Sequence, residues 1–325
     1  METRKLYYED PFQKGFATTV VSCDAVKGGY AVVLAETAFY PEGGGQPYDT
    51  GVLGEANVLE VHEKGGVITH LCDKPFEVGK SVSGKIDWAR RFDHMQQHSG
   101  EHICSGLICE RFHCDNVGFH MGADVVTIDF NADISWDELM EIEALANLYI
   151  YEDHPIDIQF YRGAELDKVE YRSKKPLEGD VRIVSFPGAD CCACCGTHVV
   201  RSGQVGLVKF LSVQKFRDGV RIELLSGKRA HRYLSECWAQ DVRIAQALSV
   251  KSNASFAGVE RVLAELSALK QRCAKLEESV FAQTAAQYEG KGDVLLFEDE
   301  MSGDSLRKLC DAVTHKATAA ITVAI

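Results

Sequence analysis

Residues 93–106 have the sequence DHMQQHSGEHICSG, in which His94, His98 and His102 recur every four residues. The surrounding residues 90–112 carry apolar side chains at helical spacing, namely Met95, Ile103, Leu107, Ile108 and Phe112. We therefore predict a helix here, on which His98 and His102 share one face and could bind one metal ion. This spacing is a weak signal by itself, because surface histidines and packed histidines produce it as well.

A second pair with the same spacing lies about 95 residues further along the chain. In CCACCGTHVV, residues 191–200, Cys194 and His198 are four residues apart, and Gly196 between them permits a tight turn. Thiolate and imidazole are preferred zinc ligands, so we predict that the two pairs converge on one zinc ion. The alternative is a closed zinc knot made of Cys191, Cys192, Cys194 and Cys195. Three ligands and an open position would indicate catalysis, whereas four would indicate a structural or positioning role.

Composition and charge limit the partners and the compartment that can be expected for this protein. The chain has 325 residues, a formal net charge of −13 and twelve cysteines. The acidic balance argues against nonspecific binding to polyanions, but it is compatible with a local basic face. The N-terminus lacks the apolar core of a secretion signal, and no apolar run approaches the length needed to cross a bilayer. We therefore expect a cytoplasmic protein with no membrane partner and with thiols free to bind metal.

The segment before the predicted helix has the pattern of a small β domain. Residues 1–88 contain strand-like runs such as YAVVLA and GVITHL, and the glycine pairs in VKGGY and EKGGV are typical of hairpin turns. Small closed barrels have this texture. We therefore predict a barrel-like N-terminal domain over residues 1–88.

The segment after the predicted helix is mixed. We predict a helix over residues 136–151, whose first turn Ser135 and Glu138 would cap. The predicted strands are residues 125–130, 156–161, 181–185 and 205–213. Their order is not a regular βαβ alternation, so residues 89–235 are predicted to form an α+β core, and the fold class is α+β.

Residues 236–290 have a third pattern, in which apolar residues step by four and three. This heptad seam consists of Val262, Leu266, Leu269, Cys273, Leu276 and Val280. We predict a helical, coiled-coil linker, which forms either a homodimer or a hairpin within one chain. Residues 291–325 are predicted to contain a strand (VLLF), a helix over 305–316 and an apolar strand ending at Ile325. Since so short a segment cannot form its own core, we expect an incomplete C-terminal α/β domain.

Residues 39–51, FYPEGGGQPYDTG, contain three consecutive glycines. Such a run either forms a bulge or tight turn or lets the backbone approach a ligand closely. It is not a P-loop, because the Lys-Ser/Thr ending is missing. Taken with HSGEH and CCGTH in this order, the motif resembles the set found in the editing domain of alanyl-tRNA synthetase and in the free-standing alanyl-tRNA editing proteins. The resemblance extends over nearly the whole chain.

This resemblance implies a zinc ion and a tRNA substrate. The zinc ligands would be His98, His102, Cys194 and His198. The substrate would be tRNA(Ala) wrongly charged with serine, or alternatively with glycine. The cleft that receives the acylated 3′ end would be lined by Gly43, Gly44, Gly45 and Gln46. No synthetase activation domain is present, so the chain should not charge tRNA itself.

Further site candidates follow from the chemistry of ester hydrolysis, which needs a positioned water and a stabilised oxyanion. Glu101 stands where the family often has a small or hydroxyl residue. It is a candidate base, an orienter of water or a hydrogen-bond partner of a ligand histidine. His94, one turn before His98, is the second catalytic candidate. Thr37 and Ser99 are hydroxyl groups that could distinguish serine from alanine, and Asn116 and His120 are further pocket candidates.

Basic residues are concentrated in residues 201–232, where we predict that tRNA binds. The candidates are Arg201, Lys209, Lys215, Arg217, Arg221, Lys228 and Arg229. Two other functions stay open. HSGEH also fits the inverted zinc-peptidase pattern HxxEH, in which Glu101 would be the base and a later glutamate the third ligand. Alternatively, an inactive tRNA-binding or dimerising module would retain tRNA without hydrolysing it.

Overall fold

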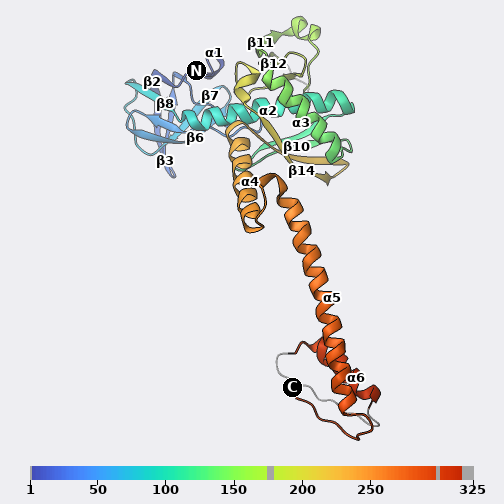
Figure 1. Cartoon of the computed structure of the whole chain (residues 1–325). Coiled ribbons are helices and arrows are strands. Elements are labelled where there is room, and N and C mark those ends of the chain that lie inside the picture. Colours follow the sequence, from blue (N-terminus) through green and yellow to red (C-terminus); the bar gives the residue numbers. More distant parts are fainter. Residues whose placement is uncertain (1, 174–178, 298–300, 317–325) are drawn as a thin grey trace. The chain divides into compact units, whose positions relative to one another are not determined.

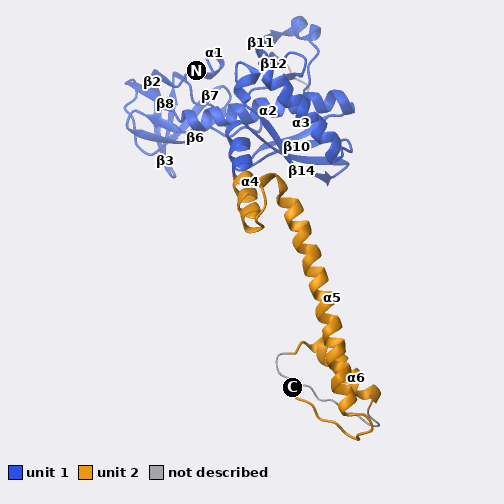
Figure 2. Cartoon of the chain, in the orientation of Figure 1, with its two compact units in different colours: residues 1–235 blue, residues 236–325 orange. Residues whose placement is uncertain are grey.

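The computed structural model describes residues 2–173, 179–297 and 301–316, and its mixture of helices and sheets confirms the predicted α+β class. The chain divides into two compact units, Met1–Ser235 and Glu236–Ile325 (Figure 2). The finer division into four parts, with boundaries at residues 88, 235 and 290, stays a prediction. Unit 1 contains all three sequence motifs, so it is the part that forms the site.

One part of unit 1 is a ring of six antiparallel strands, hydrogen-bonded in the order β2-β3-β7-β6-β5-β8 and closed between β8 and β2 (Figure 1). Burial alternates along β2 and β7, as expected where one face of a strand covers a core. The two predicted glycine turns join β2 to β3 and β6 to β7. The strands are β2 Gly15–Val26, β3 Gly29–Leu34, β5 Gly51–Leu53, β6 Ala56–Lys64, β7 Val67–Cys72 and β8 Ser81–Ile86; the short β1 Arg4–Lys5, α1 Leu6–Glu9 and β4 Glu36–Thr37 accompany the ring.

Helix α2, Trp88–Phe112, confirms the helix predicted over residues 90–112. The Asp87 carboxylate caps its start by accepting a hydrogen bond of 3.1 Å from the Arg90 backbone N–H. The helix ends at His113, whose φ of 48° is left-handed. Fifteen of its 25 residues are buried, so α2 meets neighbours on several sides instead of exposing one polar face.

Two glycines allow other segments to approach α2 closely. A Cβ at Gly100 would lie 2.1 Å from Ser226 Oγ, and a Cβ at Gly106 would lie 2.0 Å from the Ala189 carbonyl oxygen. Both distances are far below van der Waals contact. The glycines of HSGEHICSG are therefore required for packing, which brings the segment before CCACCGTH next to the histidine pair.

The remainder of unit 1 consists of two antiparallel sheets and helix α3, Trp136–Tyr151. The predicted capping box at the start of α3 is present, with Ser135 and Glu138 bonded to each other's backbone N–H groups. One sheet has the order β14-β15-β10-β9 and the other β11-β12-β13. Their bounds are β9 Asn116–Met121, β10 Val126–Phe130, β11 Asp157–Arg162, β12 Asp180–Phe186, β13 Asp190–Ala193, β14 Val208–Phe216 and β15 Gly219–Ser226, with 3-10 turns η1 Gly163–Lys168 and η2 Ser202–Val205.

Helix α4, Gly227–Ala247, crosses the boundary between the units, and unit 2 continues with η3 Ser252–Ala254, α5 Ser255–Gln287 and α6 Gly303–Lys316. A small cluster that includes Phe281, Leu309 and Val313 joins α6 to the C-terminal part of α5. The predicted heptad seam lies on α5 but is exposed, with Leu269 and Leu276 exposed by 56% and 57%. The described residues therefore form no coiled coil along this seam.

The prediction for the end of the chain is partly wrong. Residues 294–297 form no strand, because a strand needs a hydrogen-bonded neighbour and none of the described residues supplies one here. Helix α6 matches the predicted helix over residues 305–316. The predicted strand ending at Ile325 lies outside the described residues. Within the described chain, no helix has both the length and the apolar character that crossing a membrane requires.

Candidate metal centre

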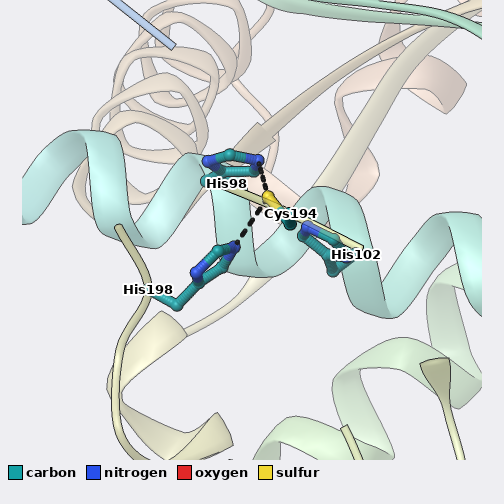
Figure 3. Close-up of side chains that lie close together, drawn as sticks. All are labelled: His98, His102, Cys194 and His198. Carbon is teal, nitrogen blue, oxygen red and sulfur yellow. Dashed lines mark hydrogen bonds between the residues drawn. The ribbon is translucent and has the colours of Figure 1, made fainter. Parts of the chain in front are cut away.

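The two sequence pairs meet at one point in unit 1 (Figure 3). His98 and His102 project from α2, and Cys194 and His198 come from the segment that follows β13. One ligand atom from each residue lies within 4.8 Å of all the others. Cys194 Sγ is 3.4 Å from His98 Nε2 and 3.6 Å from His198 Nε2. The cluster is formed from segments almost 100 residues apart, as the repeated spacing predicts.

The hydrogen bonds behind His98 fix which ring nitrogen faces the cluster. Gln46 Oε1 accepts a hydrogen bond of 3.0 Å from the Thr197 backbone N–H, which can only donate. The same oxygen lies 2.9 Å from His98 Nδ1, so Nδ1 must carry the hydrogen. In the neutral imidazole, His98 Nε2 then presents a lone pair toward Cys194, which is the arrangement that a metal requires.

His102 is held in the same way. Its Nδ1 lies 2.8 Å from Asp190 Oδ2, and a carboxylate can only accept, so Nε2 again faces the cluster. Asp190 is itself held by Arg172, with N–O distances of 2.7 and 2.9 Å. His198 differs, because its Nδ1 is buried without a hydrogen-bond partner among the described residues.

Electrostatics favour a thiolate at the centre. Burial alone would raise the pKa of Cys194, but the imidazoles of His98, His198 and His102 lower it well below its ordinary value. Burial lowers the pKa of His198 well below its ordinary value, so this imidazole is neutral. Burial also acts to lower the pKa of His102, but Cys194 and Asp190 raise it well above its ordinary value. A divalent cation would replace the proton that His102 otherwise carries beside the thiolate.

The residues present fit a zinc ion. One thiolate and three imidazoles are a common zinc donor set, and two of the imidazoles have outer partners that orient them. Gly196, in the turn between Cys194 and His198, has a role of its own: a Cβ there would lie 2.0 Å from His98 Cε1. Only glycine at this position lets the Cys-His turn approach the helix.

A cavity of about 310 Å³ lies against the cluster, lined by His98, His102 and Cys194. Its wall includes the carboxylate of Glu101, which accepts hydrogen bonds from Ser105 Oγ at 2.7 Å and Asn116 Nδ2 at 2.8 Å. Asn116 Oδ1 is buried and has no partner in the described part of the chain. This wall is therefore rich in acceptors and suits a ligand that donates hydrogen bonds. The other lining residues are Gly44, Phe119, Arg172, Ser173, Asp180, Val181, Arg182, Cys192, Ala193 and Cys195.

The glycine loop contributes to this cavity in a different way from the prediction. Gly43 and Gln46 close a tight turn through reciprocal backbone hydrogen bonds of 3.1 and 3.0 Å. Gly44 lines the cavity, whereas Gly45 packs so closely on Phe119 that a Cβ would lie 2.5 Å from its ring. The Gln46 side chain is fully buried behind His98, so it positions a ligand histidine instead of lining the cleft.

The structure separates several other predicted residues from the cavity. Thr37 is fully buried among the ring strands, where its hydroxyl lies 2.9 Å from His70 Nε2. Ser99 is fully buried, and its Oγ accepts a hydrogen bond from the Val199 backbone. His120 is exposed on β9. Neither Thr37 nor Ser99 lines the cavity. Sequence spacing alone does not reveal in which direction such side chains point.

His94 is also placed differently from the prediction. It is buried, 3% exposed, and lines a second cavity, whose residues do not include His98 or His102. Its expected catalytic role beside the zinc ligands is therefore not supported by its position.

The predicted basic residues do not form one surface. Five of them form ion pairs: Arg201 with Asp153, Lys209 with Glu143, Arg221 with Asp129 and Arg229 with Asp93 at 2.6–2.8 Å, and Lys215 with Asp133 at 3.8 Å. Lys215 and Arg217 lie exposed near the turn between β14 and β15, whereas Lys228 and Arg229 line the second cavity. Lys228 and Arg229 therefore share one cavity, whereas Lys215 lines a different one.

Family models and individual relatives both relate this chain to alanyl-tRNA synthetases and alanyl-tRNA editing proteins. The family model of threonyl and alanyl tRNA synthetase second additional domain matches residues 181–223, and that of tRNA synthetases class II (A) matches residues 12–90. Alanyl-tRNA editing protein AlaX-L of Pyrococcus horikoshii is 30% identical over 311 residues, covering 92% of this chain and 75% of the relative. Alanyl-tRNA editing protein Aarsd1-A of Xenopus laevis is 30% identical over 301 residues, covering 87% and 73%. The chain belongs to the alanyl-tRNA editing protein family.

Alanine–tRNA ligases are related to this family member as well. The ligase of Pyrococcus abyssi is 35% identical over 333 residues, which cover 94% of this chain but only 35% of the ligase. The chain thus spans about a third of the length of the ligases that it matches. Family resemblance did not reveal Asp190 or Gln46 as partners of the ligand histidines, although Asp190 directly precedes CCACCGTH and Gln46 ends the glycine run.

A buried ion pair connects the glycine loop to α2 in this editing-family chain. Arg91 and Asp49 both have fully buried side chains, and Arg91 Nε lies 2.9 Å from Asp49 Oδ2. Asp49 also accepts a hydrogen bond from the Tyr40 backbone N–H at 2.8 Å. The two ends of the motif FYPEGGGQPYD are thereby held together against the start of the histidine helix.

Proposed function

We propose that this protein hydrolyses the aminoacyl ester of tRNA(Ala) charged with the wrong amino acid, most specifically serine, with glycine as the alternative. The observation that carries the proposal is the meeting of the His-His and Cys-His pairs beside a cavity of about 310 Å³, in a chain whose relatives are named alanyl-tRNA editing proteins. The reaction class is that of an aminoacyl-tRNA deacylase. The twelve free thiols are consistent with work in the reducing cytoplasm.

In this proposal, His98, His102, Cys194 and His198 bind zinc. Zinc, when bound, supplies a positive charge that can polarise an ester oxygen or orient the terminal ribose or amine. Because four protein ligands fill a tetrahedral ion, we favour the positioning role. Gln46 and Asp190 hold the two helix histidines in the correct tautomer.

Glu101 faces the cavity with Asn116 beside it. A buried carboxylate and an unpaired amide oxygen can accept hydrogen bonds from the α-ammonium of an aminoacyl ester or from the attacking water. Discrimination against alanine would require that the serine hydroxyl be bound by polar groups that alanine leaves unpaired. Neither Thr37 nor Ser99 can do this from its buried place.

The test is a deacylation assay with tRNA(Ala) charged with serine, glycine or alanine. We expect release of serine or glycine, with alanine spared, and loss of this activity in Cys194→Ser. The nearby Cys191→Ser is the matched control and should retain activity, because Cys191 is not in the cluster and does not line the cavity. Peptide cleavage without deacylation would support the HxxEH peptidase, and tRNA binding without deacylation would support an inactive module.

We also propose that the exposed seam of α5 pairs with a second copy of the chain. Its apolar residues follow a heptad spacing, and coiled-coil pairing would bury them. Light scattering coupled to size-exclusion chromatography should give a dimer for the natural chain and a monomer for Leu266→Lys combined with Leu269→Lys. A natural chain that is monomeric at high concentration would contradict this.

A further inference from the structure

A second cavity in unit 1 is strongly basic. Its volume is about 410 Å³, and it is lined by four cationic side chains, those of Arg90, Lys228, Arg229 and Arg232, against one carboxylate, that of Asp93. Such a concentration of positive charge stands out in a chain with a formal net charge of −13. The cavity therefore suits an anion.

Two of these cations are held in place by the protein. Arg229 is paired with Asp93 at 2.7 Å and donates to the Gly122 carbonyl oxygen at 2.7 Å. The Arg90 Nε–H donates to the Tyr48 carbonyl oxygen at 3.0 Å. The Arg90 guanidinium is fixed through Nε, so its terminal N–H groups have a set direction that matches the oxygens of a phosphate. Arg229 donates from all three of its nitrogens within the protein and contributes mainly its positive charge.

A buried histidine gives an independent indication of a ligand. His94 lines this cavity, is only 3% exposed, and its Nδ1 has no hydrogen-bond partner among the described residues. An unpaired buried nitrogen is costly unless a ligand or water satisfies it. Burial first, and then the charges of Arg90 and Arg229, lower the pKa of His94 to about 3, so the ring is neutral and its N–H can donate to an anion.

The basic cavity lies next to the metal centre along two elements. His94 and His98 are one helical turn apart on α2, which is about 6 Å along the axis. Pro47 lines the basic cavity, and Gly44, three residues earlier in the glycine loop, lines the cavity at the metal centre. The first turn of α4 supplies Lys228 and Arg229 and adds the partial positive charge of a helix N-terminus.

We infer that the basic cavity binds a phosphodiester group of the single-stranded 3′ end of the tRNA while the acylated ribose occupies the cavity at the metal centre. The inference rests on the proposed function for the identity of the strand. The chemistry that recognises the group is two guanidinium groups, an ammonium group and a neutral imidazole. Arg201, Lys209 and Arg221 are less suited, because none of them lines this cavity.

The experiment compares two substrates that differ in phosphodiester content. One is seryl-tRNA(Ala), and the other is the 3′-seryl ester of adenosine, which has no phosphodiester. We expect Lys228→Gln combined with Arg232→Gln to raise KM for the tRNA about tenfold or more, with kcat nearly unchanged. Hydrolysis of the adenosine ester should stay the same. The salt dependence of tRNA binding should also weaken, by about one unit of slope for each phosphate that the protein no longer neutralises.

Matched controls are Lys64→Gln combined with Lys85→Gln, two exposed lysines on the ring strands that change the net charge equally. These should leave KM for the tRNA within about twofold. An equal loss with both substrates, or no change with tRNA, would overturn the inference.

If the natural chain cleaves neither substrate, the proposed function fails, and the inference is then decided by binding. The probe is an uncharged oligonucleotide that ends in CCA, and its affinity is measured by fluorescence anisotropy. Weaker binding by the cavity variant than by the control variant supports a phosphodiester site. Equal binding by both overturns it.

Discussion

Two regions of unit 1 bury histidine side chains, and they use them differently. His70, on β7, is fully buried in the ring, where both nitrogens have protein partners: Nδ1 donates to the Val32 carbonyl oxygen at 3.1 Å and Nε2 lies 2.9 Å from Thr37 Oγ1. His98 and His102 are buried to a similar degree, but each has only one nitrogen held by an outer oxygen, while the other faces Cys194. Burial therefore does not distinguish a structural histidine from a ligand histidine, whereas the direction of its second nitrogen does.

The largest effect should come from removing an inward-facing imidazole. We expect His102→Ala to abolish stoichiometric zinc and to lower the deacylation rate by on the order of 1,000-fold, or about 4 kcal/mol, because the ion loses a ligand and its charge. Metal content by mass spectrometry and single-turnover deacylation measure both. Treatment of the natural protein with a strong chelator should lower the rate to a comparable degree.

His70→Gln is the contrasting variant. It should keep zinc and most of the activity at neutral pH, since His70 is not part of the cluster. Retention of full zinc in His102→Ala, or its loss in His70→Gln, would break the comparison between the two kinds of buried histidine.

The second effect is on stability, and it concerns His70. Burial lowers its pKa from 6.5 to about 4, so the unfolded state takes up a proton at a higher pH than the folded state does. The contribution of His70 to the free energy of unfolding is therefore complete above about pH 6.5. This free energy falls by on the order of 3 kcal/mol in total as the pH falls toward 4. Urea unfolding at pH 7 and pH 4.5 should show a smaller acid loss for His70→Gln than for the natural protein. An identical loss for both proteins would mean that His70 titrates normally in the folded state.

The parts of this molecule that could be predicted from sequence are those decided by local chemistry. The helix over residues 90–112, the cap of Ser135 and Glu138 and the glycine turns each depend on neighbours within a few residues. The meeting of Cys194 with His98 was predictable because both pairs repeat a four-residue spacing with zinc-binding side chains. Residues 294–297 were mispredicted because an apolar run becomes a strand only where another strand is available, and the described residues supply none beside them.

The rest of the site depends on directions that sequence spacing does not contain. Gln46 belongs to the predicted glycine loop, yet it turns inward to His98, while Gly44 faces the cavity. Ser99 adjoins His98 on the helix, yet it lies on another face and bonds the Val199 backbone. Membership of the motif was therefore predictable, but each residue's role was set by the long-range packing of α2.

The third prediction tests the hydrogen bond between Gln46 and His98. Gln46→Leu removes the acceptor of His98 Nδ1, so we expect zinc to bind 10–100-fold more weakly, as measured by competition with a chelating dye. Gln46→Glu keeps an oxygen at the same place and should recover most of the affinity. If Gln46→Leu binds zinc as well as the natural protein but has a raised KM, Gln46 contacts substrate, as the sequence predicts.

The smallest effect should come from an exposed histidine, His120. His120 is exposed on β9 and is not among the residues that line the cavity, although its neighbour Phe119 stacks on His98 with ring centroids 5.1 Å apart. Because adjacent residues of a strand point to opposite faces, Phe119 and His120 should differ sharply. We expect His120→Ala to change kcat/KM less than about twofold, and Phe119→Ala to lower it by more, in the same deacylation assay. A tenfold loss in His120→Ala would show that the substrate extends around the edge of β9, and the site would then be larger than the buried cluster and its cavity.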